Sequence, residues 1–102
     1  MKKGYWIGRV DVDDEAAYRA YVQANAAPFA RYGARFLIRG GAFEAPEGTA
    51  RARNVVIEFP TYQAALDCYN SADYQAAKAL RDPVSTGDIV IIEGYDGPQP
   101  EG

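Results

Sequence analysis

Four charged residues in strand-like segments could carry chemistry: Arg9, Arg39, Glu58 and Glu93. If the strand of Arg9 lies between those of Glu58 and Glu93, opposite charges can meet across neighbouring strands on one sheet face. Such a set could bind an anion or transfer a proton, with the arginines holding a carboxylate or an enolate. The alternative is a structural ion-pair network buried between two sheets, which we favour because buried charges are usually paired.

A second candidate site is aromatic. Gly8 and Gly40 would leave space between a sheet and its helices, and this space could be bordered by Trp6, Tyr18, Tyr21, Tyr69 and Tyr74. An apolar pocket with a few phenol hydroxyls suits a small organic molecule. The alternatives are that these aromatic residues simply form the core, and that the glycines mark a strand bulge.

The sequence contains no histidine and one cysteine. The lack of histidine excludes His-dependent triads, His-ligated haem and iron sites, and most zinc sites. We therefore expect no metal and no cofactor. Cys68 has no histidine to activate it, so we expect a buried, unreactive thiol.

Composition bounds the class of protein. The 102 residues suffice for one domain. A net charge of −3 argues against nucleic-acid binding. The single cysteine rules out an internal disulfide and fits a reducing compartment. The N-terminal residues include no apolar stretch long enough for a signal peptide or a membrane span, so we expect a soluble, cytoplasmic protein.

The segment 53–61 is expected to form the central strand, because Val55, Val56, Ile57 and Phe59 make a nearly unbroken apolar run that Pro60 closes. The other predicted strands are Gly4–Val12, Arg35–Phe43 and Asp88–Tyr95. A first helix follows a cap at Asp13 or Asp14, kinks or breaks near Ala26-Ala27 because of Pro28, and ends at Gly33. A second helix runs from Thr61 to Asn70, restarts at Ser71 and is stopped by Pro83.

The order β-α-β-β-α-β predicts a ferredoxin-like α+β fold. Its four-stranded antiparallel sheet would have the order 4-1-3-2, with the helices on one face. Residues 1–95 form this single domain, and residues 96–102 are expected to be a flexible C-terminal tail, since they contain no apolar side chain to bury.

Strict alternation assigns each strand residue to one face of this sheet. The predicted helix-covered face takes Trp6, Val10, Phe36, Ile38, Val55, Ile57, Phe59, Val90 and Ile92. The opposite face takes Tyr5, Ile7, Leu37, Phe43, Val56, Ile89, Ile91 and Tyr95. The apolar surface of this second set is larger than the apolar patches that monomeric proteins commonly expose. A second copy of the same sheet is its simplest cover, which predicts a homodimeric α/β barrel.

Several motifs together resemble the domain of unknown function 1330 family: residues 4–7, 39–41, 54–60 and 68–71, with Tyr74-Gln75. The resemblance runs from about Gly4 to Gly94. Thr61 stands where the family often has serine, and Ala72 where it usually has proline. The resemblance implies a fold of the dimeric α/β-barrel superfamily and a dimer, but no established reaction. Its superfamily relatives include cofactor-free monooxygenases, isomerases and haem enzymes, and the missing histidine argues against the last group.

These observations predict a homodimer that binds a small organic molecule, with a cofactor-independent isomerase or monooxygenase as the candidate activity. The alternative is a non-catalytic module that senses a ligand or serves as an interaction platform. We expect no membrane partner and no nucleic-acid partner.

Overall fold

The computed structural model describes residues 2–101; the two ends of the predicted domain and tail, residues 1 and 102, lie outside this range. The elements follow the predicted order: β1 Gly4–Val12, α1 Glu15–Ala24, α2 Ala26–Arg31, β2 Arg35–Arg39, β3 Arg53–Phe59, α3 Tyr62–Asn70, α4 Ala72–Arg81, a short 3-10 helix Asp82–Val84, and β4 Ser85–Glu93. The four strands form one antiparallel sheet in the order β2-β3-β1-β4, which confirms the ferredoxin-like prediction.

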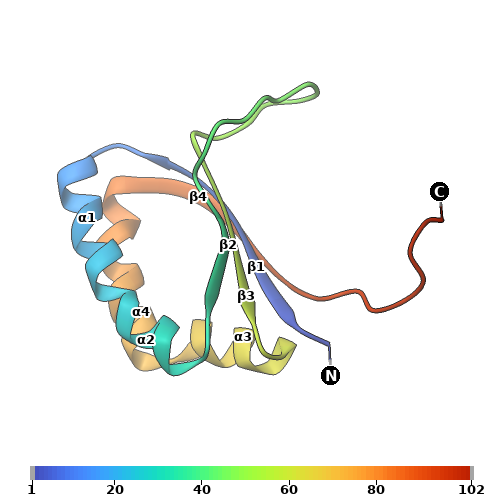
Figure 1. Cartoon of the computed structure of the whole chain (residues 1–102). Helices are drawn as coiled ribbons and strands as arrows, with labels where there is room; N and C mark the ends of the chain where they lie inside the picture. The colour runs from blue at the N-terminus through green and yellow to red at the C-terminus, as the bar shows by residue number, and fades with distance from the viewer. Residues whose placement is uncertain (1, 102) are drawn as a thin grey trace.

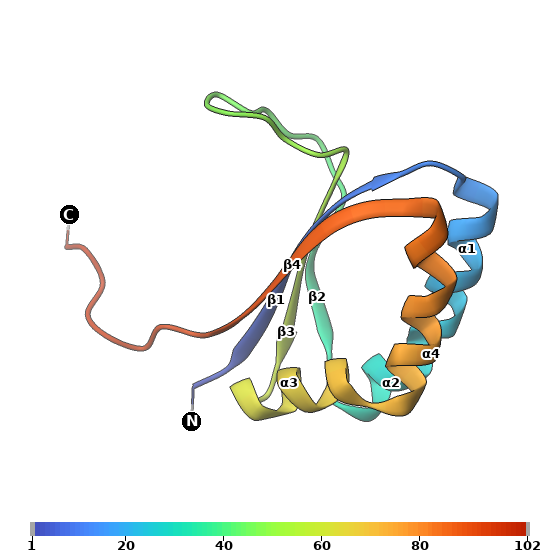
Figure 2. The ribbon, with the colours of Figure 1, turned by 180° about the vertical axis from the view of Figure 1, so that it is seen from behind.

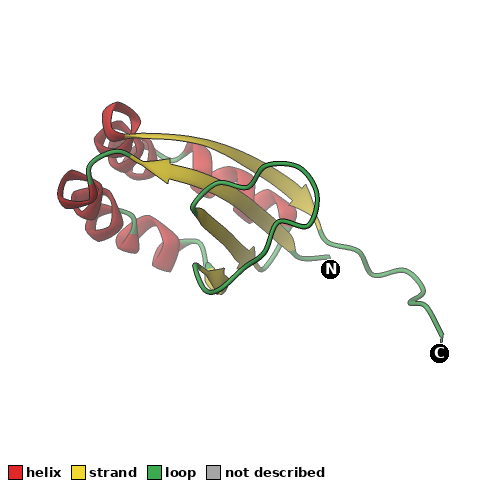
Figure 3. Cartoon of the chain, turned by 90° about the horizontal axis from the view of Figure 1, so that it is seen from above, coloured by secondary structure: helices red, strands yellow, loops and turns green. Residues whose placement is uncertain are grey.

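All helices cover the same face of this sheet (Figures 1 and 2). Seen from above, the sheet and the helices form two layers, and one face of the sheet carries no helix (Figure 3). Among residues 2–101, no helix has the length and hydrophobicity needed to cross a bilayer.

Local capping sets where the helices begin and end. Asp14 and Thr61 each accept a hydrogen bond from the backbone N–H three residues on, and Ser71 does the same at the start of α4. The first helix breaks at Asn25, three residues before Pro28, because proline cannot donate to the helical ladder. Gly33 has φ +74° at the end of α2, as its position after the helix predicted.

Trp6 is the centre of the core between sheet and helices. Its side chain is only 2% exposed, and Nε1 donates to the carbonyl oxygen of Ala65 at 2.9 Å. The rings of Phe29, Phe59 and Tyr74 lie 4.9–5.3 Å from the indole. The contacts with Phe29 and Tyr74 are edge-on, a geometry that adds to the free energy of burying the rings. The indole therefore ties β1 to α3 and fixes how the helical layer sits on the sheet.

Cys68 is fully buried on α3, where its Sγ lies 3.8 Å from the carbonyl oxygen of Pro28. Burial raises the pKa of this thiol to about 12. A thiol in this environment stays protonated and is a poor nucleophile at neutral pH.

The predicted faces of β4 are wrong by one residue. Trp6 lies opposite Ile91, and Gly8 lies opposite Ile89. Directly opposed residues share a sheet face, so Ile89 and Ile91 face the helices, while Val90 and Ile92 face away. The run 89–92 is apolar throughout, so alternation within the strand could not reveal its phase.

The second strand departs from prediction in two ways. It ends at Arg39 rather than at Phe43, and its pairing with β3 shifts between Phe36 and Ile38. This bulge moves Ile38 to the helix-free face and turns Arg39 toward the helices. From the sequence, a bulge or a close backbone approach was expected at Gly40-Gly41. These glycines instead adopt φ +75° and +106°, where the chain leaves the strand.

The last strand begins at Ser85, earlier than predicted, so Gly87 lies inside β4. A Cβ at Gly87 would come within 2.6 Å of the carbonyl oxygen of Arg9. This glycine permits close approach of β4 to β1 and does not mark the start of the strand.

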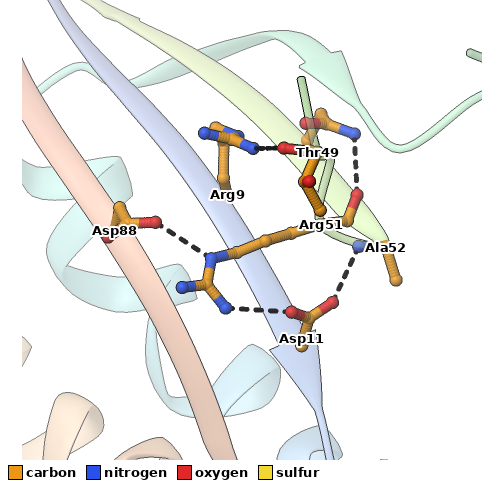
Figure 4. A network of polar contacts seen from close by, with 7 residues as sticks. Arg9, Asp11, Thr49, Arg51, Ala52 and Asp88 are labelled. Atoms are coloured by element: carbon orange, nitrogen blue, oxygen red, sulfur yellow. Dashed lines mark hydrogen bonds and ion pairs between the residues drawn. The ribbon is translucent and has the colours of Figure 1, made fainter. Parts of the chain in front are cut away.

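A polar network on the helix-free side holds the base of the long segment 40–52 between β2 and β3 (Figure 4). Arg51 bridges Asp11 of β1 and Asp88 of β4, each at 2.9 Å. The N–H of Ala52 donates to Asp11, and Arg9 donates to the carbonyl oxygen of Thr49. The rest of this segment projects beyond the body of the domain, as does the C-terminal tail (Figure 1).

Candidate functional site

A cavity of about 120 Å³ lies between the sheet and helices α1 and α4, and it opens to solvent. We call it the Trp6 cleft. Strands β1, β3 and β4 contribute Trp6, Gly8, Val10, Arg53, Val55, Ile57 and Ile89; the end of β2 contributes Arg39 and Gly40; the helices contribute Tyr18, Tyr21, Val22, Asn25 and Arg81.

Gly8 makes the space on the floor of the cleft. It lies between Trp6 and Val10 on the same face of β1, where a side chain would otherwise fill the gap. A Cβ built there would meet only Ile89 Cγ1, at 3.9 Å. The glycine is thus required neither by a close approach nor by a positive φ, and its effect is to leave a cavity.

Phenol groups form one wall. The hydroxyls of Tyr21 and Tyr74 share a hydrogen bond of 2.9 Å beneath the cleft. Burial raises the pKa values of Tyr18 and Tyr74 above the ordinary tyrosine range. Both phenols therefore stay protonated at neutral pH and can donate hydrogen bonds, but they are poor general bases.

Three arginines reach the cleft from three different elements: Arg39, Arg53 and Arg81. The guanidinium of Arg39 lies 4.0 Å from the ring centroid of Phe36, and that of Arg53 lies 5.0 Å from the ring of Tyr18. Arg81 lies 5.5 Å from the ring of Tyr21. Aromatic faces thus orient all three cations without neutralising them.

The predicted aromatic set is largely brought together. Trp6, Tyr18 and Tyr21 line the cleft with Gly8 and Gly40, and Tyr74 lies directly behind Tyr21. Tyr69 does not line it. It packs against the indole and borders a separate hollow with Lys78 and Asp82. Binding of a molecule at the cleft stays a prediction.

The predicted charged set is not gathered in this chain. Arg9 and Glu58 lie on the helix-free face, since they oppose Asn54 and Tyr5 respectively. Arg39 and Glu93 lie on the other face, opposite Val55 and Gly4. Glu58 instead pairs with Lys3 at 3.2 Å, and Glu93 with Lys2 at 3.7 Å. The bulge in β2 and the phase of β4 separated the residues that alternation had placed together.

Sequence reasoning missed Arg53, Arg81 and Asn25 as cleft residues. Arg53 carried a usable signal, because it shares the parity of Val55 and Ile57 on the face assigned to the helices. Arg81 carried a weaker one, because it lies at helical spacing from Tyr74 and Ala77, the buried residues of α4. Asn25 is 6% exposed at the break between α1 and α2, and its helical spacing from Tyr18, Tyr21 and Val22 marked it as inward-facing.

The family description "Domain of unknown function (DUF1330)" matches residues 3–95. The chain belongs to the DUF1330 family. Among proteins with curated descriptions, none matches it.

Solved structures share the fold of this DUF1330 protein at low identity. A protein of unknown function from Rhodopseudomonas palustris, RPA0582, is 14% identical with a TM-score of 0.75, over 94% of this chain and 85% of that one. SnoaB from Streptomyces nogalater, described as a cofactor-independent oxygenase, is 16% identical with a TM-score of 0.65, over 99% and 100% of the two chains. A dimeric ferredoxin-like protein of unknown function from Thermobifida fusca is 15% identical with a TM-score of 0.61, over 90% and 91%.

Proposed function

We propose that this DUF1330 protein forms a homodimer through its helix-free sheet face and binds a small organic molecule in the Trp6 cleft. The observation that carries the binding proposal is the space above Gly8. It is bordered by the only tryptophan of the chain and by two tyrosines, and no backbone constraint requires it. A solvent-open apolar cavity with a few convergent polar groups is the usual form of a ligand site.

The proposed dimer interface is an apolar row that crosses the sheet. Ile38 opposes Val56, Val56 opposes Ile7, and Ile7 opposes Val90. Ile7, Ile38 and Val90 are 41%, 48% and 53% exposed, so the row has no cover within one chain. A matching sheet would bury it, and the dimeric description of the Thermobifida fusca relative supports this arrangement.

The chemistry of the cleft favours binding over proton transfer. Among residues 2–101, its lining contains arginines, phenols and an asparagine, but no carboxylate, histidine or thiol. These groups can stabilise negative charge on an oxygen atom, which a cofactor-independent isomerase or monooxygenase would need for an enolate. They supply no base to generate that enolate. We therefore propose turnover only for a substrate that contains a basic group able to take up the proton, or that is already ionised when it binds.

Likeness to SnoaB supports the enzymatic alternative at the level of fold alone. A non-catalytic ligand sensor uses the same cleft without turnover. The two alternatives are distinguished once a ligand is known, because an enzyme converts it during incubation whereas a sensor returns it unchanged.

Binding can be tested through the emission of Trp6. A metabolite screen read by intrinsic fluorescence should yield ligands that shift the emission. Gly8→Leu should abolish the shift by filling the cavity, although overpacking could cost about 1–3 kcal/mol of stability. Gly8→Ala adds a single methyl near Ile89 and should retain binding, which makes it the matched control. Light scattering checks that both variants keep the oligomeric state of the parent chain. Ligands that bind Gly8→Leu as well as the parent protein would place the site elsewhere.

A further inference from the structure

We infer that the ligand of the Trp6 cleft is a small organic carboxylate with a body about the size of one six-membered ring. This inference rests on the proposed function, because it names the ligand class of the same cleft. It is carried by the charge of the lining, by the buried and unpaired Nε of Arg81 and by the size of the cavity.

The cleft is lined by positive side chains in an acidic protein. The chain carries a formal net charge of −3, yet the described part of the chain lines the cleft with three arginines and no aspartate, glutamate or lysine. These arginines come from β2, β3 and α4, so no single amphipathic element accounts for their convergence. Cationic groups gathered in a partly enclosed cavity attract and orient an anion.

Local carboxylates neutralise this charge incompletely. Arg53 pairs with Glu15, whose side chain is 62% exposed. Arg81 reaches its neighbour Asp82 through Nη1 at 3.4 Å, which is a long contact. Within residues 2–101, Arg39 has no carboxylate partner. At least one guanidinium is thus available to a ligand.

Arg81 also carries a donor that the protein leaves unmet. Its side chain is 11% exposed, and its Nε is buried without a hydrogen-bond partner among the described residues. A buried donor left unpaired costs free energy, which a carboxylate oxygen would recover once the Arg81 side chain shifts to admit it, because this Nε is closed to solvent. Arginine presents its N–H groups in a planar fork that matches the two oxygens of a carboxylate.

The size of the cavity limits the rest of the ligand. An engineered protein cavity of about 150 Å³ is known to hold benzene. The Trp6 cleft measures about 120 Å³ and is walled by Trp6, Tyr18, Val55 and Ile57. A single ring or a branched chain of similar volume fits among these side chains, while the carboxylate meets the arginines.

The test compares matched acids and amides. A panel of small monocarboxylates that includes benzoate is titrated beside the corresponding amides, such as benzamide, which have nearly the same shape without the charge. The readout is the indole N–H signal of Trp6 in ¹H–¹⁵N NMR spectra, which is a single peak because the chain has one tryptophan. Acids should shift this peak at concentrations at least tenfold lower than their amides do. Inorganic phosphate, which is anionic but has no apolar body, should shift it least.

Substitution assigns the effect to the cleft arginines. Arg39→Met should weaken acid binding about tenfold to a hundredfold and leave amide binding nearly unchanged, as expected for loss of a charged hydrogen bond. Arg39 is exposed, so this variant should fold; Arg81→Met tests the buried donor. Arg19→Met is the matched control, because Arg19 is exposed on α1 and does not line the cleft.

Amides that bind as tightly as their acids would overturn the carboxylate inference and leave the proposed cleft intact. Acid binding that survives both Arg39→Met and Arg81→Met would overturn the role of the arginines. Failure of every acid and amide would overturn the inference as well. The proposed function would fail with it only if the broader fluorescence screen also gave no ligand.

Discussion

Tyr21 and Tyr74 lie 53 residues apart in the chain, yet their hydroxyl oxygens meet at 2.9 Å in the core. Tyr21 comes from α1 and borders the Trp6 cleft, whereas Tyr74 comes from α4 and is fully buried behind it. This bond joins the two longest helices at the site where we propose that a ligand enters.

The bond between the two tyrosines predicts energetic coupling. Tyr74→Phe should lower the free energy of unfolding by about 1 kcal/mol, the usual net value of a neutral hydrogen bond. Tyr21→Phe with Tyr74→Phe should cost less than the sum of the single changes, because the second change removes a group already left unpaired. Urea denaturation of the four proteins measures the coupling. Strictly additive losses would show that the hydroxyls do not pair in solution.

Glu58 and Arg39 should not be coupled. They lie on opposite faces of the sheet, so Glu58→Ala and Arg39→Ala should be additive to within about 0.5 kcal/mol. Glu58→Ala alone should lower the free energy of unfolding only modestly, because its partner Lys3 is 54% exposed and can be solvated when the pair is lost. A cycle of Glu58 with Lys3 is the positive control. Coupling above 1 kcal/mol between Glu58 and Arg39 would mean that the bulge in β2 is absent in solution.

The apolar row predicts how the dimer can be broken. Ile7→Lys places a charge at the centre of the row and should convert the dimer to a monomer at micromolar concentration, as seen by light scattering. Leu80→Lys is the matched control, since Leu80 is similarly exposed (44%) but lies on α4. The intact interface should bury more than about 1,000 Å² in total. A parent protein that is already monomeric at micromolar concentration would contradict the proposal.

Asp11 predicts an acid-sensitive attachment of the segment 40–52. The N–H of Ala52, with the guanidinium of Arg51, holds the pKa of Asp11 below its ordinary value. A lowered pKa contributes stability above the unfolded value of about 3.9 and loses it as the pH falls through the folded value. Asp11→Asn should therefore increase hydrogen exchange at the Ala52 amide near pH 7. The difference from the parent protein should shrink as the pH drops below about 4. If the difference in exchange rate stays constant down to pH 2, the protection of the Ala52 amide does not depend on the ionisation of Asp11.

The amino-acid sequence by itself determined the order of elements, the helix ends and the strand order. The helix ends depend on neighbouring residues: Asp14, Thr61 and Ser71 cap the helices that follow them, and Gly33 supplies the positive φ after α2. The strand order follows from the order of elements and the handedness of crossover connections. The apolar parity of β1 and β3 was also readable, because Gly4, Gly8, Asn54 and Glu58 interrupt their apolar runs. With Trp6 in place, the same pattern was enough to predict a space beside it.

The tertiary structure alone decided the phase of β4 and the turn of Arg39 toward the cleft. Residues 89–92 are all apolar, so either phase buries two large side chains, and only pairing with β1 selects Ile89 and Ile91. The bulge at Leu37 reverses the parity of the two residues that follow it, and no glycine or proline marks its position. The convergence of Arg39, Arg53 and Arg81 depends on this bulge and on how α4 lies over the sheet. Both are set by long-range packing, which local spacing does not encode.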